Sequence, residues 1–247
     1  MEVVMLGTID MPHRYMNMEE LTRFLGLDFR RVSRMAQRGD IPCKKVGGNF
    51  RFSRAEVTEW LQQQIGHDRH DWVSMDAGMS AHRKADPEDT QVAPLLQAEA
   101  ISLSLAARTK SSVLRELVVL AQQTNRLYDG DELLEALNRR EELCGTAMEA
   151  GIAIPHPRRP LPYAVAEPII VVAHVPQGIG FGAPDGRLTD LFFMTCSQDD
   201  GHHLHVLARL CRMLSKKDFP QQLREASSPQ EVMELMCSRE LDIISES

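Results

Sequence analysis

The chain has 247 residues, of which 43% are hydrophobic and 26% are charged, and its net charge is -7. These values are typical of a globular protein and exclude a collagen-like, fibrous or wholly disordered chain. The length leaves room for two modest domains. The negative charge argues against nucleic-acid binding by the chain as a whole, but residues 12–65 hold 10 Lys and Arg against 6 Asp and Glu, a local charge of +4. This asymmetry indicates a basic contact module attached to a different domain.

Two further features bound the location and the chemistry of the protein. The sequence has no run of ~18 apolar residues and no N-terminal signal-peptide pattern, so we expect a cytoplasmic protein without membrane insertion. Its five cysteines form an odd set without a C-x-x-C pair, which argues against a disulfide framework and a zinc ribbon. We expect neither a metal ion nor another cofactor.

Residues 66–94 differ in composition from both of their flanks. They contain few aliphatic residues, show no sustained helical or strand period, and close with the polar run DPEDTQ. This composition predicts a linker that is too long for an ordinary connection inside one compact domain. We therefore expect a first domain over 12–65, a linker over 66–94 and a second domain over 95–247, with loose coupling between the domains.

The first domain has the pattern of a winged helix-turn-helix. A good N-cap, Asn17, precedes a short amphipathic helix, and a three-residue turn leads to a second helix that ends at Gly39. A two-stranded ribbon around a glycine-rich turn follows, and Ser53 caps a third helix. These elements are predicted over 17–26, 29–39, 41–53 and 53–64.

Six cations of this domain are candidates for DNA contacts. Three lie on the second helix and three on the ribbon: Arg30, Arg31, Arg34, Lys44, Lys45 and Arg51. The first three can approach a major groove and the others can neutralise backbone phosphates; the alternative is a merely solvated face. Asp28 and Asp40 weaken the patch, so we expect modest affinity for a single copy and DNA binding as a homo-oligomer.

The string MEELTRFLGLDFRRVSRMAQRGDIPCKKVGGNFRFSRAEVTEWL resembles the excisionase-type, MerR-related helix-turn-helix family. The shared features, in order, are a first helix, a G-x-[IL]-P motif, a VGG..RF wing and a closing helix that ends in Trp-Leu. They cover residues 15–62, and the resemblance implies a DNA-binding domain. No coiled-coil heptad follows the wing, so a typical MerR sensor is not expected.

The second domain runs from helices through short apolar strands to helices again. This order predicts an α/β sandwich of helices around a mixed sheet, so the whole chain is expected to be an α+β protein of two domains. The predicted helices lie over 111–126, 130–143, 202–215, 219–228 and 228–241, and the β-rich runs over 151–158, 168–176 and 188–197.

One histidine of this domain stands between two prolines, directly after an apolar strand. The prolines fix the backbone on both sides of His156, so its ring is expected to project from a rigid strand end. A neutral imidazole has one unprotonated nitrogen, can accept a phosphoryl group and can release it again. Arg140 and Thr146, upstream in the same segment, are candidates to bind the phosphoryl oxygens. A second histidine cluster opens a later helix, whose N-terminal N–H groups favour an anion.

The segment RREELCGTAMEAGIAIPHPR resembles the type-2 enzyme IIA family of the sugar phosphotransferase system, which includes a nitrogen-regulatory branch. A later pattern, a second histidine followed by L..LA.L...L, matches from His203 onward, and the resemblance covers residues 95–243. It implies that His156 accepts a phosphoryl group from an HPr-type phosphocarrier protein. It also implies that His203 holds or polarises this group and that Arg140 stabilises its charge. A sugar-permease subunit or a regulatory protein is the implied further partner.

Three departures from the family pattern leave alternatives open. The usual Ser-Thr pair is Gly145-Thr146, the glycine after the histidine is Pro157, and Glu149 is expected to place a carboxylate near the anion site. The leading hypothesis is a DNA-binding regulator that is phosphorylated on His156. The alternatives are a component that passes phosphate to a sugar permease, and a degenerate domain that binds without transferring.

The other histidines have less specific interpretations. His202 and His205, three residues apart and close to Asp199 and Asp200, make a metal site conceivable, but no cysteine joins them and none is predicted. His174 is expected to be a strand residue whose ring is satisfied by a neighbour.

Overall fold

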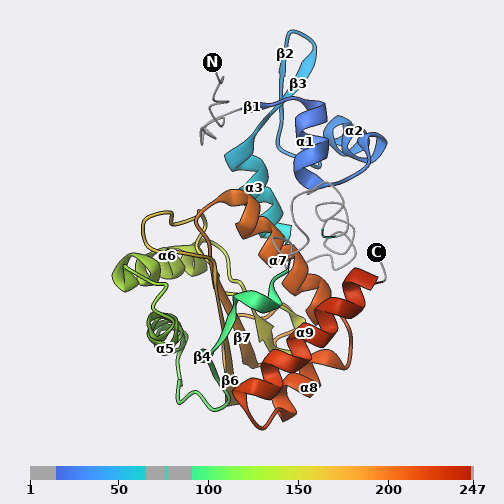
Figure 1. Cartoon of the computed structure of the whole chain (residues 1–247). Coiled ribbons are helices and arrows are strands. Elements are labelled where there is room, and N and C mark those ends of the chain that lie inside the picture. Colours follow the sequence, from blue (N-terminus) through green and yellow to red (C-terminus); the bar gives the residue numbers. More distant parts are fainter. Residues whose placement is uncertain (1–14, 65–75, 77–90, 246–247) are drawn as a thin grey trace, which may run out of the picture.

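The computed structural model describes residues 15–64, 76 and 91–245, and it shows a small helical part with a β-ribbon next to a larger α/β part (Figure 1). The predicted linker over 66–94 lies outside the described residues except for Asp76 and residues 91–94. The small part comprises β1 (Tyr15–Met16), α1 (Met18–Leu25), α2 (Phe29–Arg38), β2 (Lys44–Val46), β3 (Asn49–Ser53) and α3 (Arg54–Gln64). The predicted winged helix-turn-helix is confirmed.

Local capping explains where these helices begin and end. The Asn17 side chain accepts from the N–H of Glu20, and the Glu20 carboxylate accepts from the N–H of Asn17 in return. Gly26, with φ 62°, ends α1 in the left-handed conformation that glycine adopts without strain. Asp28 caps α2 and accepts from the N–H of Arg30 at 2.8 Å. Its carboxylate is therefore engaged with its own helix.

The ribbon has the predicted turn and one additional strand. Lys44 lies opposite Arg51 in β2 and β3, while β1 pairs with the other side of β3. The sheet order is β1-β3-β2, so β3 is central and its Phe52 is fully buried. The strand β1 was not predicted, because two residues show no period.

The α/β part is built on a four-stranded sheet in the order β4-β6-β7-β5. Strand β4 runs parallel to β6, β6 antiparallel to β7, and β5 parallel to β7, so the predicted mixed sheet is confirmed. The elements are η2 (Ala93–Leu95), β4 (Leu96–Ser102), α5 (Lys110–Gln123), α6 (Gly130–Leu143), η3 (Glu149–Gly151), β5 (Ile152–Ala153), β6 (Ile169–Ile179), β7 (Thr189–Cys196), α7 (Asp200–Leu214), α8 (Phe219–Glu225) and α9 (Pro229–Ser245).

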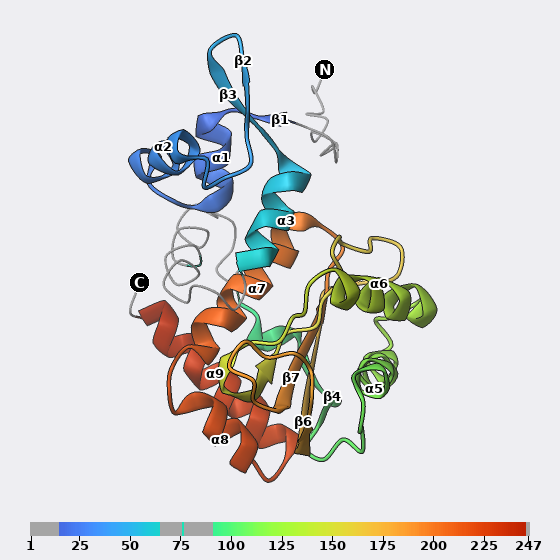
Figure 2. The ribbon, with the colours of Figure 1, turned by 180° about the vertical axis from the view of Figure 1, so that it is seen from behind.

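Helices cover both faces of this sheet, as Figure 2 shows from behind. Alternate residues of β6 point to opposite sides, so Val171 packs in the cluster that contains α5 and α6, while Val172 packs in the cluster that contains α7, α8 and α9. The second cluster also includes the buried apolar side chains of the small part, such as Leu25 and Leu61. Apolar packing therefore continues from one part of the chain to the other.

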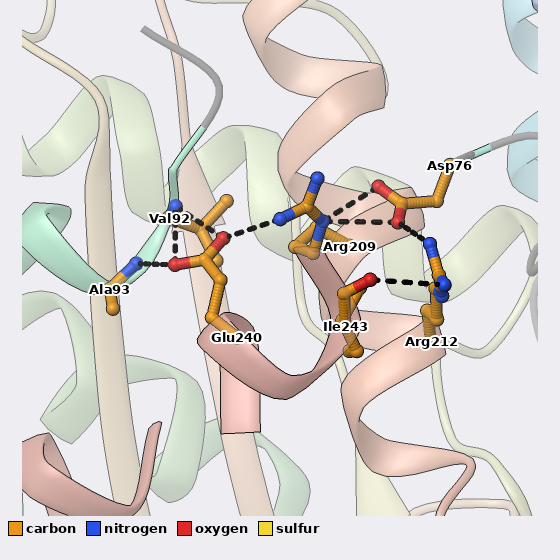
Figure 3. A network of polar contacts seen from close by, with 7 residues as sticks. All are labelled: Asp76, Val92, Ala93, Arg209, Arg212, Glu240 and Ile243. Atoms are coloured by element: carbon orange, nitrogen blue, oxygen red, sulfur yellow. Dashed lines mark hydrogen bonds and ion pairs between the residues drawn. The ribbon is translucent and has the colours of Figure 1, made fainter. Parts of the chain in front are cut away.

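A network of buried charged side chains holds Asp76 and residues 92–93, which precede β4, against helices α7 and α9 (Figure 3). Arg209 of α7 donates to Asp76 at 2.8 Å and to Glu240 of α9 at 2.9 Å. Glu240 also accepts from the N–H groups of Val92 and Ala93, at 2.9 and 2.7 Å. Burial raises the pKa of Glu240, and the hydrogen bonds and the Arg209 charge partly offset this. Two points of the chain before β4 are thus held by α7 and α9.

In the part of the chain that the structure describes, no helix is both long enough and apolar enough to cross a lipid bilayer.

Candidate functional site

Two buried histidines meet at the end of the sheet where β5 and β7 finish. His156 follows β5, and His203 lies in the first turn of α7, which begins shortly after β7. Their ring centroids are 5.5 Å apart and the rings are tilted by 56°. The backbone N–H of Thr195 donates to the Pro155 carbonyl at 2.9 Å, so β7 still holds the segment beyond β5. The parallel pair of strands therefore brings both histidines to one place.

The surroundings of His156 define its tautomer. Nδ1 lies 2.7 Å from the Ile154 carbonyl oxygen, which can only accept, so Nδ1 carries the proton. Nε2 is buried and has no hydrogen-bond partner among the described residues. Burial first, and then the charges of Arg140 and His203, hold the pKa of His156 well below its usual value. The imidazole is therefore neutral at pH 7, with its lone pair on Nε2.

Arg140 supplies a fixed positive charge to this site. It lies near the end of α6, is 4% exposed, and is held by a hydrogen bond from Nη1 to the Cys144 carbonyl. Its charge also lowers the pKa of His203, to about 4, after burial as the larger cause; the Asp199 carboxylate acts in the opposite direction. Two neutral imidazoles beside one buried cation form an environment that favours an anion.

Thr146 belongs to the site through the strand that carries His156. Its carbonyl accepts from the N–H of Ile154 at 3.1 Å. Its own N–H and hydroxyl donate to Glu141, and Lys110 of α5 forms an ion pair with Glu141 at 2.7 Å. The Thr146 hydroxyl is therefore already engaged. Glu141 was matched to the family motif but was given no role. The contact of Lys110 with this carboxylate could not be predicted, because only the fold brings α5 next to Glu141.

The expectation that Glu149 places a carboxylate near the anion site is wrong. Residues 146–148 pair with 152–154 as a hairpin, through Ala147 opposite Ala153 and the hydrogen bond from Ile154 to Thr146. Glu149 is exposed at the tip of this hairpin, which is the end opposite to His156. The Gly145 departure is also mild, because a Cβ atom at this position would make only ordinary contacts, the nearest at 3.9 Å.

The N–H groups at the start of α7 were predicted to favour an external anion, but they already have a partner. The Asp199 carboxylate caps the helix and accepts from the N–H groups of Gly201 and His202, at 2.8 and 3.0 Å. The hydrogen bond between the His202 ring and the other oxygen of this carboxylate is the main cause that lowers the pKa of Asp199 to about 2. These N–H groups are thus occupied by the chain's own carboxylate.

The remaining histidines lie in different surroundings. His202 contacts Asp199, His174 of β6 lies 3.8 Å from Asp190, and His205 is buried. Within the described ranges, no group of three or more His, Cys, Asp or Glu side chains is arranged to hold a metal ion.

The six predicted DNA-contacting cations lie on α2 and on the β2–β3 ribbon, which project from the end of the molecule away from the α/β part (Figure 1). Four of them are exposed and two are half-buried. Lys45 lies over the Phe50 ring at 5.0 Å, and Arg51 donates to the Phe50 carbonyl at 3.3 Å. The exposed residues are Arg30, Arg34, Lys44 and Lys45, and the half-buried ones are Arg31 and Arg51.

Comparison with known families accounts for both parts. Residues 94–238, more than half of the chain, match the family described as "Phosphoenolpyruvate-dependent sugar phosphotransferase system, EIIA 2". The chain belongs to this family. Residues 15–65 match a helix-turn-helix domain. Both predicted resemblances are confirmed, and we refer to the two parts below as the helix-turn-helix domain and the EIIA domain.

Individual relatives come from the fructose and nitrogen-regulatory branches. The chain is 34% identical over 149 residues to the PTS system fructose-specific EIIA component of Haloferax volcanii, which covers 60% of this chain and 95% of that protein. It is 29% identical over 147 residues to a nitrogen regulatory protein of Bradyrhizobium diazoefficiens, which covers 59% and 94%. The solved structure of nitrogen regulatory protein IIA-Ntr from Neisseria meningitidis is 27% identical, with a TM-score of 0.53, and covers 58% of this chain and 97% of that one.

The two matches have direct functional consequences. The helix-turn-helix domain indicates DNA binding, and the EIIA domain indicates a role in phosphotransfer or in its regulation.

Proposed function

We propose that this protein is a DNA-binding regulator whose EIIA domain accepts a phosphoryl group on Nε2 of His156 from an HPr-type phosphocarrier. The observation that carries the proposal is the state of this one side chain. Its Nδ1 proton is committed to the Ile154 carbonyl, its Nε2 has no hydrogen-bond partner in the described structure, and its lowered pKa keeps the ring neutral. This is the form of imidazole that acts as a nucleophile.

The transfer needs no external base. The Nε2 lone pair forms the new N–P bond while the bond from phosphorus to the donor breaks, and the donor recovers that electron pair. The proton of His156 stays on Nδ1, where the Ile154 carbonyl stabilises the resulting imidazolium. The product is a phosphorylated histidine with its ring orientation unchanged.

The proposed roles of the neighbouring residues follow from their charge and position. Arg140 stabilises the phosphoryl oxygens, since its charge already acts on both histidines. His203 is neutral at pH 7 and holds or polarises the phosphoryl group from 5.5 Å between ring centroids. Thr146 positions the His156 strand through Ile154, with Glu141 and Lys110 behind it.

For DNA, we propose that the six cations of α2 and the ribbon carry the contact. Two helices and a wing on one projecting end suit a major groove and its adjacent phosphates. Asp28 keeps its negative charge as the N-cap of α2, so Asp28 and Asp40 are still expected to weaken this surface. We retain the proposal that a homo-oligomer binds, and we place the protein in the cytoplasm, where both DNA and the phosphocarrier reach it.

Incubation with phosphoenolpyruvate, enzyme I and HPr tests the chemistry. We expect acid-labile label on the wild-type protein and none on His156→Ala, while His174→Ala keeps the label because His174 pairs with Asp190 away from the site. Label that survives in His156→Ala would overturn the assignment. Onward transfer to a permease subunit would instead favour the phosphotransfer component. The degenerate-domain alternative loses its Glu149 argument, because this carboxylate is remote from the site.

A further inference from the structure

Helix α3 of the helix-turn-helix domain lies beside α7 of the EIIA domain, the helix that carries His203 (Figures 1 and 2). Arg54, at the start of α3, forms an ion pair with Asp200 at 3.4 Å. Glu59, further along α3, forms an ion pair and hydrogen bond with Arg158. Asp200 begins α7 three residues before His203, and Arg158 follows His156 by two residues. One helix is therefore attached to both histidine-bearing segments.

The charges of this interface fix its orientation. The positive end of α3 meets a carboxylate of the EIIA domain and its negative residue meets a guanidinium, so a reversed α3 would place like charges together. The paired side chains keep partial exposure, 20% and 29% in the Arg54–Asp200 pair and 37% and 41% in the Glu59–Arg158 pair. Ion pairs of this kind contribute little each, so they orient α3 more than they hold it.

The packing along this interface is incomplete. A cavity of about 540 Å³ opens between α3 and the EIIA domain. It is lined by Ser53 and Glu56 on one side and by Arg159, Pro162 and Gln198 on the other. An interface with such a cavity is less stabilised by close packing than a domain core. Apolar packing joins the domains through the cluster that contains Leu61 of α3, but the cavity leaves another part of this interface unpacked.

The anchored Asp76 keeps α3 near this face even when it is undocked. Asp76 is held by Arg209 and Arg212 of α7, at 2.8 and 3.1 Å. The chain from Gln64 to Asp76 therefore spans at most about 40 Å when fully extended. This upper limit, set by the number of residues alone, keeps α3 within reach of its docking site after release.

Docking and phosphorylation compete for the same approach. Sheet residues Ile154 and Thr195 flank His156 on one side, Arg140 and His203 act on it from two helices, and its side chain is 0% exposed. Asp200 and Arg158, which hold α3, lie within three residues of His203 and His156, so a donor protein that approaches both histidine-bearing segments meets α3. We propose that α3 docks over the phosphoacceptor face as an intramolecular competitor of the HPr-type donor, so that docking and phosphotransfer exclude each other.

This inference rests on the proposed phosphorylation of His156 and adds a way in which the protein regulates that phosphorylation. Docking leaves α2 and the ribbon uncovered, since they project away from the EIIA domain (Figure 1). Release of α3 therefore changes how rigidly the helix-turn-helix domain is held, and not whether its cations can reach DNA.

The test uses charge reversal in the full chain. Glu59→Arg places like charges at Arg158, and the double variant Glu59→Arg with Arg158→Glu restores an opposite pair. Glu19→Arg, on the exposed side of α1, makes the same net-charge change away from the interface. Two quantities are measured: the initial rate of phosphoryl transfer from labelled HPr, and amide hydrogen exchange in the peptide that covers residues 157–162.

We expect Glu59→Arg to raise the transfer rate about fivefold, which corresponds to the loss of one partly exposed ion pair. Exchange over 157–162 rises with it, the double variant returns the exchange to the wild-type level, and Glu19→Arg changes neither quantity. Equal transfer rates and equal exchange in wild type and Glu59→Arg would overturn the docking proposal while leaving phosphorylation intact. If no variant is labelled but the exchange still responds to Glu59→Arg and to its rescue, docking stands and the proposed phosphorylation fails.

Discussion

The environment of His156 opposes a second proton, and this supports the nucleophilic role that we propose for it. Its ring is fully buried, and Arg140 lies close enough for its charge to lower the pKa further. A free imidazole loses half of its nucleophilic form near pH 6.5. A buried imidazole of this kind keeps it into more acidic solution, so the same features that hide His156 from solvent also prepare it for transfer.

The stability of the EIIA domain should depend on pH through these histidines. The folded-state pKa of His203 is about 4 against an ordinary 6.5, and that of His156 is lowered too. The unfolded chain then binds more protons between these values, so the free energy of unfolding falls as the pH falls from 6.5 towards 4. Urea unfolding followed by circular dichroism at pH 7, 6 and 5 measures this, and His203→Gln should flatten the curve. A free energy that rises on acidification would contradict the buried neutral state.

Removal of the Arg140 charge should lower the rate of phosphoryl transfer to His156. Arg140→Gln takes away the buried cation that we propose stabilises the developing phosphoryl charge, and we expect the initial rate of transfer to His156 to fall about a hundredfold. Arg139→Gln is the matched control, because Arg139 lies next to it on α6 with a side chain 71% exposed and forms an ion pair with Glu135. Equal rates in the two variants would exclude Arg140 from the reaction. The rate is read from labelled HPr.

At the scale of elements, α7 combines two tasks. Its first turn carries His203, and its middle carries Arg209 and Arg212, which hold Asp76 (Figure 3). Two arginines and two carboxylates balance in this buried network, so the loss of one member leaves an uncompensated charge. The helix that forms the site therefore also fixes the chain that leads to it.

Substitution of Asp76 should destabilise the EIIA domain. Asp76→Ala leaves Arg209 and Arg212 buried opposite Glu240 alone, and we expect the free energy of unfolding to fall by about 3–5 kcal/mol. Asp242→Ala is the control, because Asp242 is 54% exposed and its pair with Arg239 is long, at 3.9 Å; this change should cost less than about 1 kcal/mol. Urea unfolding gives both values. Similar small effects would show that Asp76 is not part of the folded core.

Local sequence signals predicted most of the elements, while long-range contacts were beyond them. Asn17 and the glycine turns were sufficient to predict the helices and the ribbon of the first domain, because caps and turns depend on contacts within a few residues. Strand β4 was missed because LQAEAIS holds glutamine, glutamate and alanine, which have low strand propensity. The Lys110–Glu141 and Asp76–Arg209 pairs join distant segments. The position of Glu149 was predicted wrongly, because the prediction rested on its closeness to His156 in sequence. The hairpin between the two residues places them at opposite ends.

At the scale of the molecule, charge is separated by domain. The chain carries -7 in total, yet the cations of the helix-turn-helix domain lie at the end that projects away from the acidic EIIA domain (Figure 1). Interactions between exposed charges are screened over about 8–10 Å in physiological salt, so a DNA duplex at this end experiences the local surface more than the net charge. Net charge alone therefore does not predict how the protein meets DNA.

Salt dependence of DNA binding tests this separation. If all six cations of α2 and the ribbon neutralise phosphates, the slope of log K against log salt concentration for an arbitrary duplex of 20 base pairs should reach about -5 per helix-turn-helix domain. Lys44→Ala, at an exposed ribbon position, should make the slope shallower by about 1. Arg139→Ala on the exposed face of α6 changes the net charge equally and should leave the slope unchanged, since it lies in the EIIA domain. Fluorescence anisotropy between 50 and 200 mM salt, a range of about fourfold over which such contacts are lost, gives each slope. A slope near zero, or an equal effect of the two substitutions, would mean that the net charge and not the projecting surface governs binding.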